Sequence, residues 1–294
     1  MSSIEIIKSG ITKLNTDAIV NAANEALREG SGVCGAIFSE AGSFEMTKAC
    51  SGIGGCRTGN AVITPGFKLP ARYVIHAVGP RWSGGDHNEP KLLYSAYKQS
   101  LILAKENNLH SIGFPLISAG IFGYPVDKAW RKAIQACVDY IQANADYEMN
   151  IVFAVLDDVI LGDGLRTLGE VSREKGYIDF KRINKFAQRY QVLFSTAEDH
   201  YGNLESRFGD ECFASGFEMD CGKEFIEVYG YEAIDKYEGL SKVIDRIDDP
   251  MLLGSGIFSK WRGITHWSYM DSVISEENRP WFVLALSKLA ELTA

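Results

Sequence analysis

The sequence predicts an α/β layered domain followed by a second, mostly α-helical domain. The chain has 294 residues, about twice the ~150 that is a soft prior for one domain. Its first half alternates strand-like and helix-like segments, which is typical of layered α/β domains. From about Lys175 the strand-like alternation nearly disappears and helical patterns take over.

Six short apolar runs in the first half predict strands. They fall at residues 4–7, 18–20, 60–64, 73–78, 111–115 and 151–156. The runs at 73–78 and 151–156 are almost continuously apolar, as strands buried between two helical layers must be. Two intervening segments, 89–107 and 126–143, repeat apolar residues at helical spacing, and the first has Pro90 in its opening turn.

The second half carries the signals of helices. Residues 179–194 place apolar side chains in helical register. Asp249 and Pro250 are a favourable N-cap and first helical residue. Polar residues 275–278 precede a final helix. We therefore predict one domain at residues 1–170 and another at 176–294, with no internal repeat between them.

Composition excludes several classes of protein. Hydrophobic residues make up 46% and charged residues 23% of the chain, which is close to the globular average and excludes disordered, collagen-like and coiled-coil chains. No apolar run approaches the ~20 residues that cross a bilayer, and the first residues lack a signal-peptide pattern. We therefore expect a cytoplasmic protein without a membrane partner.

The net charge of −8 is spread over both halves of the chain. Neither half carries a basic block, so the long-range attraction that drives nucleic-acid binding is missing, and nucleic acid is not an expected partner. The six cysteines include no CxxC pair, so we expect reduced thiols and no bound metal, the alternative being a zinc site formed by Cys212, Cys221 and a histidine. We also expect no cofactor. An anionic ligand would have to be held by local backbone geometry.

Two glycine-rich loops follow predicted strands in the first half. Asn21-Ala22-Ala23-Asn24 ends one strand and leads to Gly30-Ser31-Gly32-Val33-Cys34-Gly35-Ala36-Ile37, which runs into a helix. Ser118-Ala119-Gly120-Ile121-Phe122-Gly123 follows another strand and also precedes a helix. Glycines let backbone N–H groups converge on a phosphate, and a helix N-terminus adds partial positive charge. Two such loops can face each other at a sheet edge and hold a diphosphate; the alternative is a pair of ordinary strand-to-helix turns.

Together these stretches resemble the macrodomain family, in particular its MacroD-like branch. The branch has an Asn-Ala-Ala-Asn strand end and a G-G-G-V-D-G-A-I loop, which correspond to the residues quoted above. Its G-x-A-x-x-T-x-G-x-x-L-P-A-x-x-V-I-H-x-V-G-P stretch matches residues 59–80, and its F-P-x-I-S-x-G-I-Y-G-Y-P stretch matches residues 114–125. The resemblance covers about residues 3–165 and implies a three-layer α/β/α macrodomain with a mixed central sheet. Residues 176–294 resemble no family that we can name.

The resemblance implies binding of ADP-ribose and, in this branch, hydrolysis of ADP-ribosyl esters or deacetylation of O-acetyl-ADP-ribose. It places Asn24 at the distal ribose and Ile11 beside the adenine. The residues implied to line the diphosphate are Gly32, Val33 and Gly35 on one side and Ser118, Ala119, Gly120, Ile121 and Phe122 on the other. ADP-ribose or a related nucleotide is the expected ligand, and ADP-ribosylated protein is a second candidate partner.

Cys34 stands where the MacroD-like branch has its catalytic aspartate. A carboxylate at this place can activate water, whereas a thiol, with an ordinary pKa of about 8.5, is mostly protonated near neutrality. Cys34 either acts with Asn24 in catalysis or is a small packing or ligand-contact residue. The protein is accordingly a hydrolase or a non-catalytic reader of ADP-ribose, and a scaffold whose helical half binds a protein is a third hypothesis.

The adenine end also departs from the family pattern. Gly10 replaces the aspartate that accepts a hydrogen bond from the adenine amino group, and Leu156 replaces an aromatic ring that stacks on adenine in many members. These changes indicate looser base recognition or a ligand with a different base. Asp157 or Asp17 could compensate for the missing aspartate.

Two other features have both a structural and a functional interpretation. His76 lies in a buried apolar strand, where a core histidine is favoured over a general base. The polar loop 83–89 is either a solvated connection before a helix or a source of an acid, an imidazole and a carboxamide that replace the missing aspartate.

Overall fold

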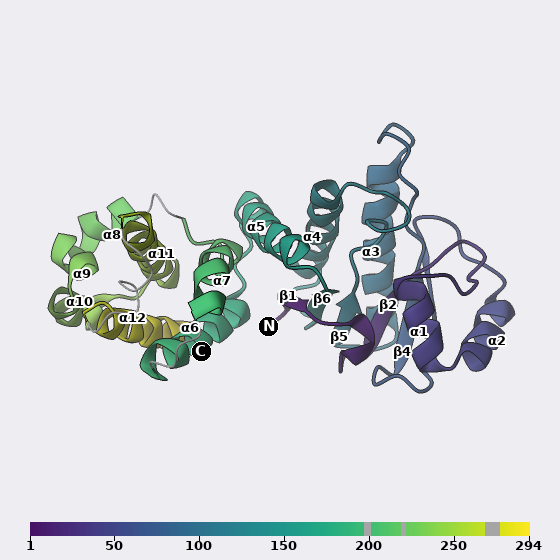
Figure 1. Ribbon diagram of the computed structural model, residues 1–294, viewed down its shortest axis with the longest axis horizontal. Helices are drawn as coiled ribbons and strands as arrows, with labels where there is room; N and C mark the ends of the chain where they lie inside the picture. The colour runs from purple at the N-terminus through teal and green to yellow at the C-terminus, as the bar shows by residue number, and fades with distance from the viewer. Residues whose placement is uncertain (197–200, 219–221, 268–276) are drawn as a thin grey trace. The chain divides into compact units, whose positions relative to one another are not determined.

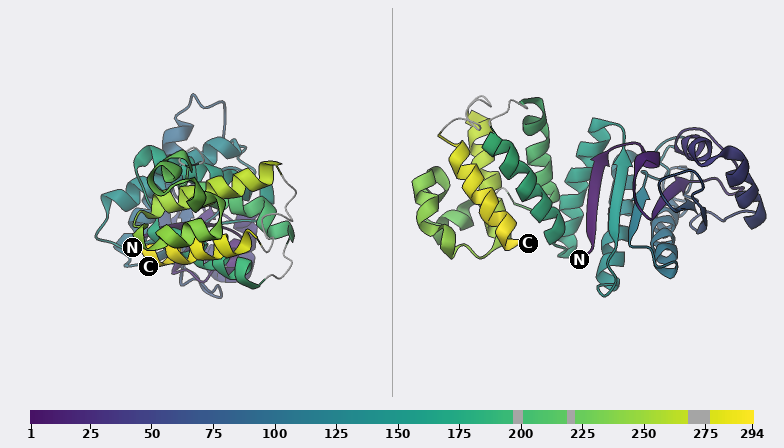
Figure 2. Two further views of the ribbon diagram at one scale, coloured as in Figure 1. Left: turned by 90° about the vertical axis from the view of Figure 1, so that its left-hand side faces the viewer. Right: turned by 90° about the horizontal axis from the view of Figure 1, so that it is seen from below.

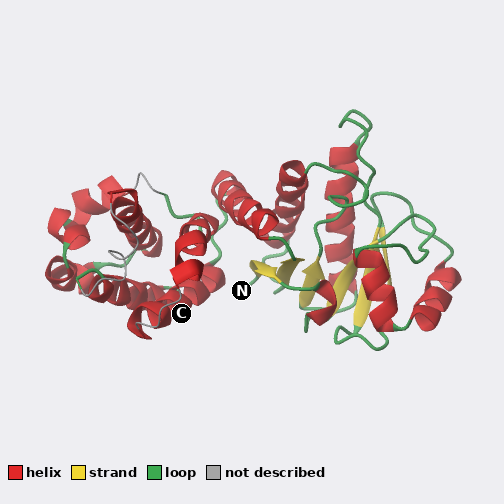
Figure 3. Ribbon diagram, viewed as in Figure 1, coloured by secondary structure: helices red, strands yellow, loops and turns green. Residues whose placement is uncertain are grey.

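The computed structural model of the protein describes residues 1–196, 201–218, 222–267 and 277–294. The chain divides into two compact units, Met1–Thr167 and Leu168–Ala294, and most of their helices and strands are labelled in Figure 1. Figure 3 shows the described strands in the first unit, whereas the described part of the second unit consists of helices and loops. Among the described helices, none combines the length and the apolar composition needed to cross a lipid bilayer.

The first unit is built on one six-stranded sheet, whose strands run side by side in the right-hand view of Figure 2. The strands are β1 (Ser3–Lys8), β2 (Ala18–Ala22), β3 (Ala61–Pro65), β4 (Tyr73–Ala77), β5 (Ser111–Phe114) and β6 (Asn150–Val155). Their order is β1-β6-β5-β2-β4-β3, and every neighbouring pair is parallel except β3 and β4. Each strand lies within two residues of a predicted run, and the mixed sheet confirms the predicted fold class.

Helices cover both faces of this sheet. The elements are η1 (Ile11–Lys13), α1 (Val33–Ala41), α2 (Ser43–Ile53), α3 (Glu89–Glu106), α4 (Val126–Ala143) and α5 (Asp158–Lys175). Buried residues of α1 and α2 form one apolar cluster with Val152 and Ala154 of β6. On β6 the ring of Phe153 contacts Tyr97 of α3 and Trp130 of α4, with ring centroids 6.1 and 5.2 Å apart. Because successive side chains of a strand point to opposite faces, α3 and α4 cover the face opposite α1, which gives three layers.

The second unit packs its helices around an aromatic core. Its helices are α6 (Phe180–Thr196), α7 (Tyr201–Ala214), α8 (Gly222–Tyr229), α9 (Tyr231–Asp235), α10 (Tyr237–Val243), α11 (Pro250–Trp267) and α12 (Arg279–Leu292), with a 3-10 turn η2 (Ile244–Arg246). The rings of Phe194 and Phe282 stack with centroids 4.7 Å apart and join α6 to α12.

The helix signals of the second half are confirmed where the structure describes them. The Asp249 carboxylate accepts hydrogen bonds from the N–H groups of Met251 and Leu252, so Asp249 is the N-cap of α11. Helices α8, α9 and α10 are too short to show a periodic pattern, and the sequence does not predict them. Residues 275 and 276, the start of the expected final helix, lie outside the described residues.

Candidate functional site

The strand order creates a crevice at the carboxyl ends of β2 and β5. These strands are adjacent and parallel, yet β2 leads into α1 on one face of the sheet and β5 leads into α4 on the other. Open α/β sheets bind ligands at such a switch point. A cavity of about 420 Å³ opens here, with walls from the loop after β2, the start of α1, and the loops after β4 and β5. We refer to it as the first cavity.

The N-terminus of α1 forms one wall of the first cavity. Gly32 precedes the helix with a φ angle of +63°, a conformation that favours glycine. A Cβ atom at Gly35 would lie 2.6 Å from the carbonyl oxygen of Gly30, so only glycine lets the loop fold over the first turn. The first N–H groups of an α-helix have no partner within the helix, so those of Val33 and Cys34 are available to an anion.

The loop after β5 forms another wall. Ser118 has a φ angle of +67°, which is unusual for a residue with a side chain, and it is only 6% exposed. Its hydroxyl group has no hydrogen-bond partner in the described part of the chain. A Cβ atom at Gly79 would lie 2.2 Å from this hydroxyl oxygen, so the glycine after β4 makes room for it. A strained backbone and an unpartnered buried hydroxyl beside a cavity indicate a place that a ligand completes.

Cys34 lines the first cavity but is only 6% exposed. The Asn21 amide nitrogen donates to its sulfur at 3.6 Å, and the thiol lies 3.8 Å from the carbonyl oxygen of Arg28. Burial raises the pKa of Cys34 above its ordinary value, although the hydrogen bond from Asn21 acts in the opposite direction. The side chain is therefore a protonated thiol at neutral pH, which favours a contact role over a nucleophilic one.

His76 lies on β4, faces the core and is fully buried. Its Nδ1 is 3.1 Å from the Asn21 amide nitrogen, and its Nε2 is 2.9 Å from the Thr64 hydroxyl. With the amide as donor, Nδ1 accepts and the Nε2–H group donates to Thr64. Burial lowers the pKa of His76 to about 4, so the ring is neutral at physiological pH. It is a hydrogen-bonded core residue that does not line the first cavity.

The residues expected at the adenine end lie outside the first cavity. Ile11 is buried in the core with 6% exposure, whereas Leu156 is 75% exposed. The Asp157 carboxylate accepts from the N–H groups of Val159 at 2.8 Å and Ile160 at 3.0 Å. Asp157 therefore caps the start of α5, and its carboxylate is already engaged.

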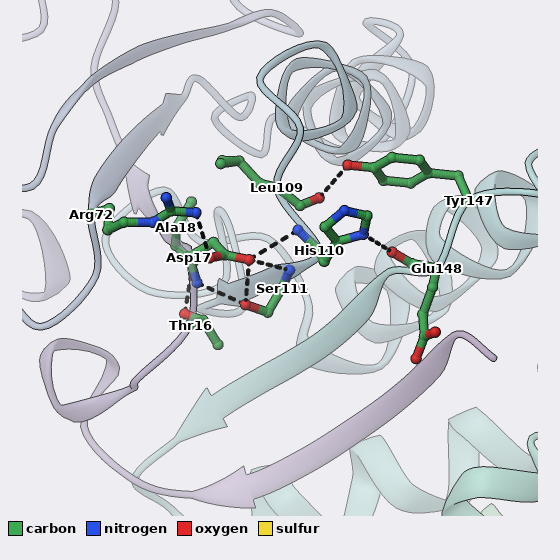
Figure 4. A network of polar contacts seen from close by, with 9 residues as sticks. All are labelled: Thr16, Asp17, Ala18, Arg72, Leu109, His110, Ser111, Tyr147 and Glu148. Atoms are coloured by element: carbon green, nitrogen blue, oxygen red, sulfur yellow. Dashed lines mark hydrogen bonds and ion pairs between the residues drawn. The ribbon is translucent and has the colours of Figure 1, made fainter.

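Asp17 precedes β2 at the amino ends of the strands, so it cannot compensate at the adenine end (Figure 4). One carboxylate oxygen accepts from the N–H groups of His110 and Ser111 at 2.9 and 3.0 Å, and from the Ser111 hydroxyl at 2.9 Å. The other accepts from the Arg72 guanidinium at 2.7 Å. Burial would raise the pKa of Asp17, but these contacts outweigh it and lower the pKa. The proposal that Asp17 replaces the missing aspartate is wrong.

The structure brings most of the expected site residues together. Those that line the first cavity are Asn24, Gly32, Val33, Cys34, Ser118, Gly120, Ile121 and Phe122. Those that do not line it are Ile11, Gly35, Ala119, Leu156 and Asp157. Arg81 also lines the first cavity, although the sequence patterns do not single it out. The one sequence feature that indicates Arg81 is its place directly after the Val78-Gly79-Pro80 strand end.

Within the residues that the structure describes, no group of three or more histidine, cysteine, aspartate or glutamate side chains is placed to hold a metal ion. Cys221 lies outside the described residues.

Comparison with known proteins points to one family. The Macro domain family model matches residues 20–133. A macro domain-containing protein of Chlorobaculum tepidum is 48% identical over 155 residues, which cover 53% of this chain and 89% of that protein. The O-acetyl-ADP-ribose deacetylase of Salmonella typhimurium is 49% identical over 144 residues, which cover 48% of this chain and 80% of that protein. The solved structure of the Oceanobacillus iheyensis macrodomain with ADP aligns with a TM-score of 0.55 and 36% identity, covering 59% of this chain and 93% of that one.

Proposed function

Because the chain belongs to the macrodomain family, we propose that its first unit binds ADP-ribose or a closely related nucleotide in the first cavity. The observation that carries this proposal is the combination of a helix N-terminus with the unpartnered buried hydroxyl of Ser118 around one cavity. Both supply neutral hydrogen-bond donors, which suits a diphosphate in a protein of net charge −8. We assign this role to residues 1–170 and treat residues 176–294 as a separate helical domain.

We propose further that the protein hydrolyses ADP-ribosyl esters, either on mono-ADP-ribosylated protein or in O-acetyl-ADP-ribose. The name of the Salmonella relative supports a reaction of this class. Hydrolysis adds one water molecule across the ester and releases a carboxylate, a ribose hydroxyl and a proton. Asn24 orients the distal ribose in this scheme, and the bound diphosphate positions the attacking water.

A non-catalytic reader of ADP-ribose is the second candidate function, and Cys34 favours it. The raised pKa of this buried thiol leaves no general base at the position of the family's catalytic aspartate. The walls that would hold the diphosphate do not depend on that aspartate. A reader would therefore keep the binding site and lose turnover.

Titration calorimetry of the full-length protein tests the binding proposal. We expect saturable binding of ADP-ribose and weaker binding of AMP, because AMP lacks the diphosphate and the distal ribose. Gly35→Ala should abolish binding, since its Cβ atom would lie 2.6 Å from the Gly30 carbonyl oxygen. Gly52→Ala is the matched control, because a Cβ atom there meets nothing within 4 Å. No binding of ADP-ribose by the wild type would reject the proposal.

Turnover separates the two candidate functions. The protein is incubated with a peptide that carries ADP-ribose on a glutamate side chain, and free ADP-ribose is measured. Release above the uncatalysed rate supports the hydrolase, whereas tight binding without release supports the reader.

A further inference from the structure

A large groove lies between two helices of the first unit, apart from the first cavity. Helices α3 and α4 lie side by side (Figure 1), and the space between residues 94–106 of α3 and residues 139–144 of α4 has a volume of about 790 Å³. We refer to it as the α3–α4 groove. It shares no residue with the first cavity. Because both helices end shortly before a parallel strand begins, the groove extends toward the amino ends of the strands, opposite the proposed nucleotide site.

Two hydrogen bonds cross the α3–α4 groove and hold its walls together. The Tyr94 hydroxyl donates to the Asp139 carboxylate at 2.8 Å, and the Lys105 ammonium donates to the side-chain oxygen of Asn144 at 2.7 Å. The Lys105 nitrogen also lies 5.2 Å from the centroid of the Tyr147 ring. That ring is itself fixed, because its hydroxyl donates to a backbone carbonyl oxygen at 2.8 Å (Figure 4). The groove is therefore formed before any ligand enters it.

Tyr140 lines the α3–α4 groove with a hydroxyl group that has no partner. The side chain is only 5% exposed, and its hydroxyl makes no hydrogen bond in the described part of the chain. Burial raises the pKa of Tyr140 to about 12, so the group is protonated and can donate. A buried tyrosine hydroxyl normally has a partner, because leaving it unpaired costs free energy. A ligand atom that accepts a hydrogen bond would remove that cost.

Lys98 supplies a free positive charge at the same groove. It is exposed on α3, and no ion pair or hydrogen bond of its ammonium group occurs among the residues that the structure describes. Lys105 lies about 10 Å further along the helix and is already bonded to α4. Glu106 and Asp139 also line the groove, so its acidic and basic side chains balance. One added negative charge near Lys98 is favourable, whereas a multiply charged anion would be repelled by the two carboxylates.

The rest of the groove is suited to an apolar chain. Ile102 lies one helical turn after Lys98 on α3, and Ala143 faces the groove from α4. An apolar group placed against these side chains would remove hydrocarbon surface from water. Cavities of about 300–1,000 Å³ typically hold small organic ligands, so a groove of about 790 Å³ has room for such a molecule.

We propose that the α3–α4 groove binds a monocarboxylic acid with an apolar chain. Its carboxylate accepts hydrogen bonds from Lys98 and Tyr140, and its chain packs along Ile102 and Ala143. The diphosphate of ADP-ribose carries more than one negative charge, so ADP-ribose does not bind here. The proposal is independent of the function proposed for the first cavity.

Titration calorimetry of the full-length protein with octanoate tests the proposal. We expect saturable binding with a dissociation constant of about 1 mM or lower. Octanamide and octylamine have the same chain without the negative charge and should bind at least about tenfold more weakly. Lys98→Gln and Tyr140→Phe should each weaken octanoate binding at least about fivefold, because hydrogen bonds to a charged group are among the strong ones.

Matched variants control for the two substitutions. Lys91→Gln and Tyr237→Phe change exposed residues outside the groove and should leave octanoate binding unchanged. Tyr140→Phe removes only a hydroxyl without a partner, so thermal unfolding of this variant should occur at the wild-type temperature or above. Saturating ADP-ribose should change the octanoate affinity by less than about twofold, because the two sites share no residue.

Several results would overturn the proposal. One is the absence of saturable octanoate binding, and another is equally tight binding of octanamide or octylamine. A third is an octanoate affinity that Lys98→Gln or Tyr140→Phe leaves unchanged. Displacement of octanoate by ADP-ribose would place the acid in the first cavity and would also overturn the proposal. Failure of the wild type to bind ADP-ribose would reject only the function proposed for the first cavity.

Discussion

The side-chain amide of Asn24 closes onto the backbone of Arg28. The Asn24 nitrogen donates to the Arg28 carbonyl oxygen at 2.7 Å, and the Asn24 oxygen accepts from the Arg28 N–H group at 3.1 Å. The side chain thus fixes the loop between β2 and α1 and keeps one amide hydrogen for another partner. The proposed binding of the distal ribose and the shaping of the loop therefore depend on the same group.

Replacing Asn24 should weaken ligand binding for both reasons. We expect Asn24→Ala to raise the dissociation constant for ADP-ribose at least about tenfold, since lost hydrogen bonds of this kind are worth about 1 kcal/mol each. Calorimetry measures the change. Asn107→Ala is the control, because that amide donates to the Leu103 carbonyl oxygen at the end of α3, outside the first cavity. Equal affinities of Asn24→Ala and the wild type for ADP-ribose would show that Asn24 does not contribute to ligand binding.

Cys34→Asp should increase ester hydrolysis. An ionised carboxylate can accept a proton from water, whereas burial raises the pKa of the natural thiol and keeps it protonated. A positioned general base typically contributes about 10²–10⁴ in rate, so a gain of at least about tenfold in the release of ADP-ribose is expected. Cys34→Ser, which is neutral and similar in size, should show no gain. If the aspartate variant were no faster than the serine variant, position 34 would not limit turnover.

The sequence predicts the strands and the two loops because their signals are local. A buried strand needs a short apolar run, and Gly32 and Gly35 are set by backbone geometry within one turn. The contacts of Asp17 are not local, because its carboxylate accepts from the N–H groups of His110 and Ser111, which lie 93 and 94 positions further along the chain. The contacts of Asp157 are local, since it caps α5 by accepting from the N–H groups of Val159 and Ile160.

The sequence also does not predict the chain of hydrogen bonds that runs from Cys34 through Asn21 to His76. It joins residues 13 and 55 positions apart in sequence and depends on the pairing of β2 with β4. The stacking of Arg81 on Phe122 is of the same kind, since it brings together the loops after β4 and β5. Motifs can indicate which loops meet, but not which side chains between them stay unpaired.

Gly10→Asp should make the protein bind ADP-ribose in preference to an analogue with a different base. Gly10 has φ of −72° and ψ of 134°, which any residue adopts, and a Cβ atom there would make only an ordinary contact with Lys13 at 3.8 Å. The added carboxylate can accept from the adenine amino group, so ADP-ribose should bind several-fold more tightly, up to about tenfold. The inosine analogue, which lacks that amino group, should not gain. Gly10→Ala supplies the side-chain bulk without the acceptor; an equal gain there would exclude a hydrogen bond to the base.

His76 should make the first unit less stable in mild acid. Its pKa is about 6.5 when unfolded and about 4 in the fold, so between these values the unfolded chain binds a proton that the folded chain does not. Stability is therefore fully present above pH 6.5 and falls as the pH drops toward 4, by about 3 kcal/mol. Denaturant unfolding across this range should give a shallower pH dependence for His76→Gln than for the wild type. Identical slopes would mean that the buried ring does not resist protonation.

Asp17→Asn should lower stability without affecting the ligand. The carboxylate ties the residues before β4 and β5 to β2 at the amino ends of the strands, opposite the edge that carries the first cavity. Because hydrogen bonds to a charged group contribute more than neutral ones, we expect the free energy of unfolding to fall by about 1–3 kcal/mol at pH 7.

The stabilisation of the fold by Asp17 should be lost as the pH falls. The lowered pKa means that the ionised form stabilises the fold, so the difference between wild type and Asp17→Asn should be full above about pH 4 and shrink as the pH falls further. Asp146→Asn, an exposed substitution of the same type, controls for net charge. Calorimetry should give the same ADP-ribose affinity for all three proteins. A large loss of affinity in Asp17→Asn alone would show that the two ends of the strands are coupled.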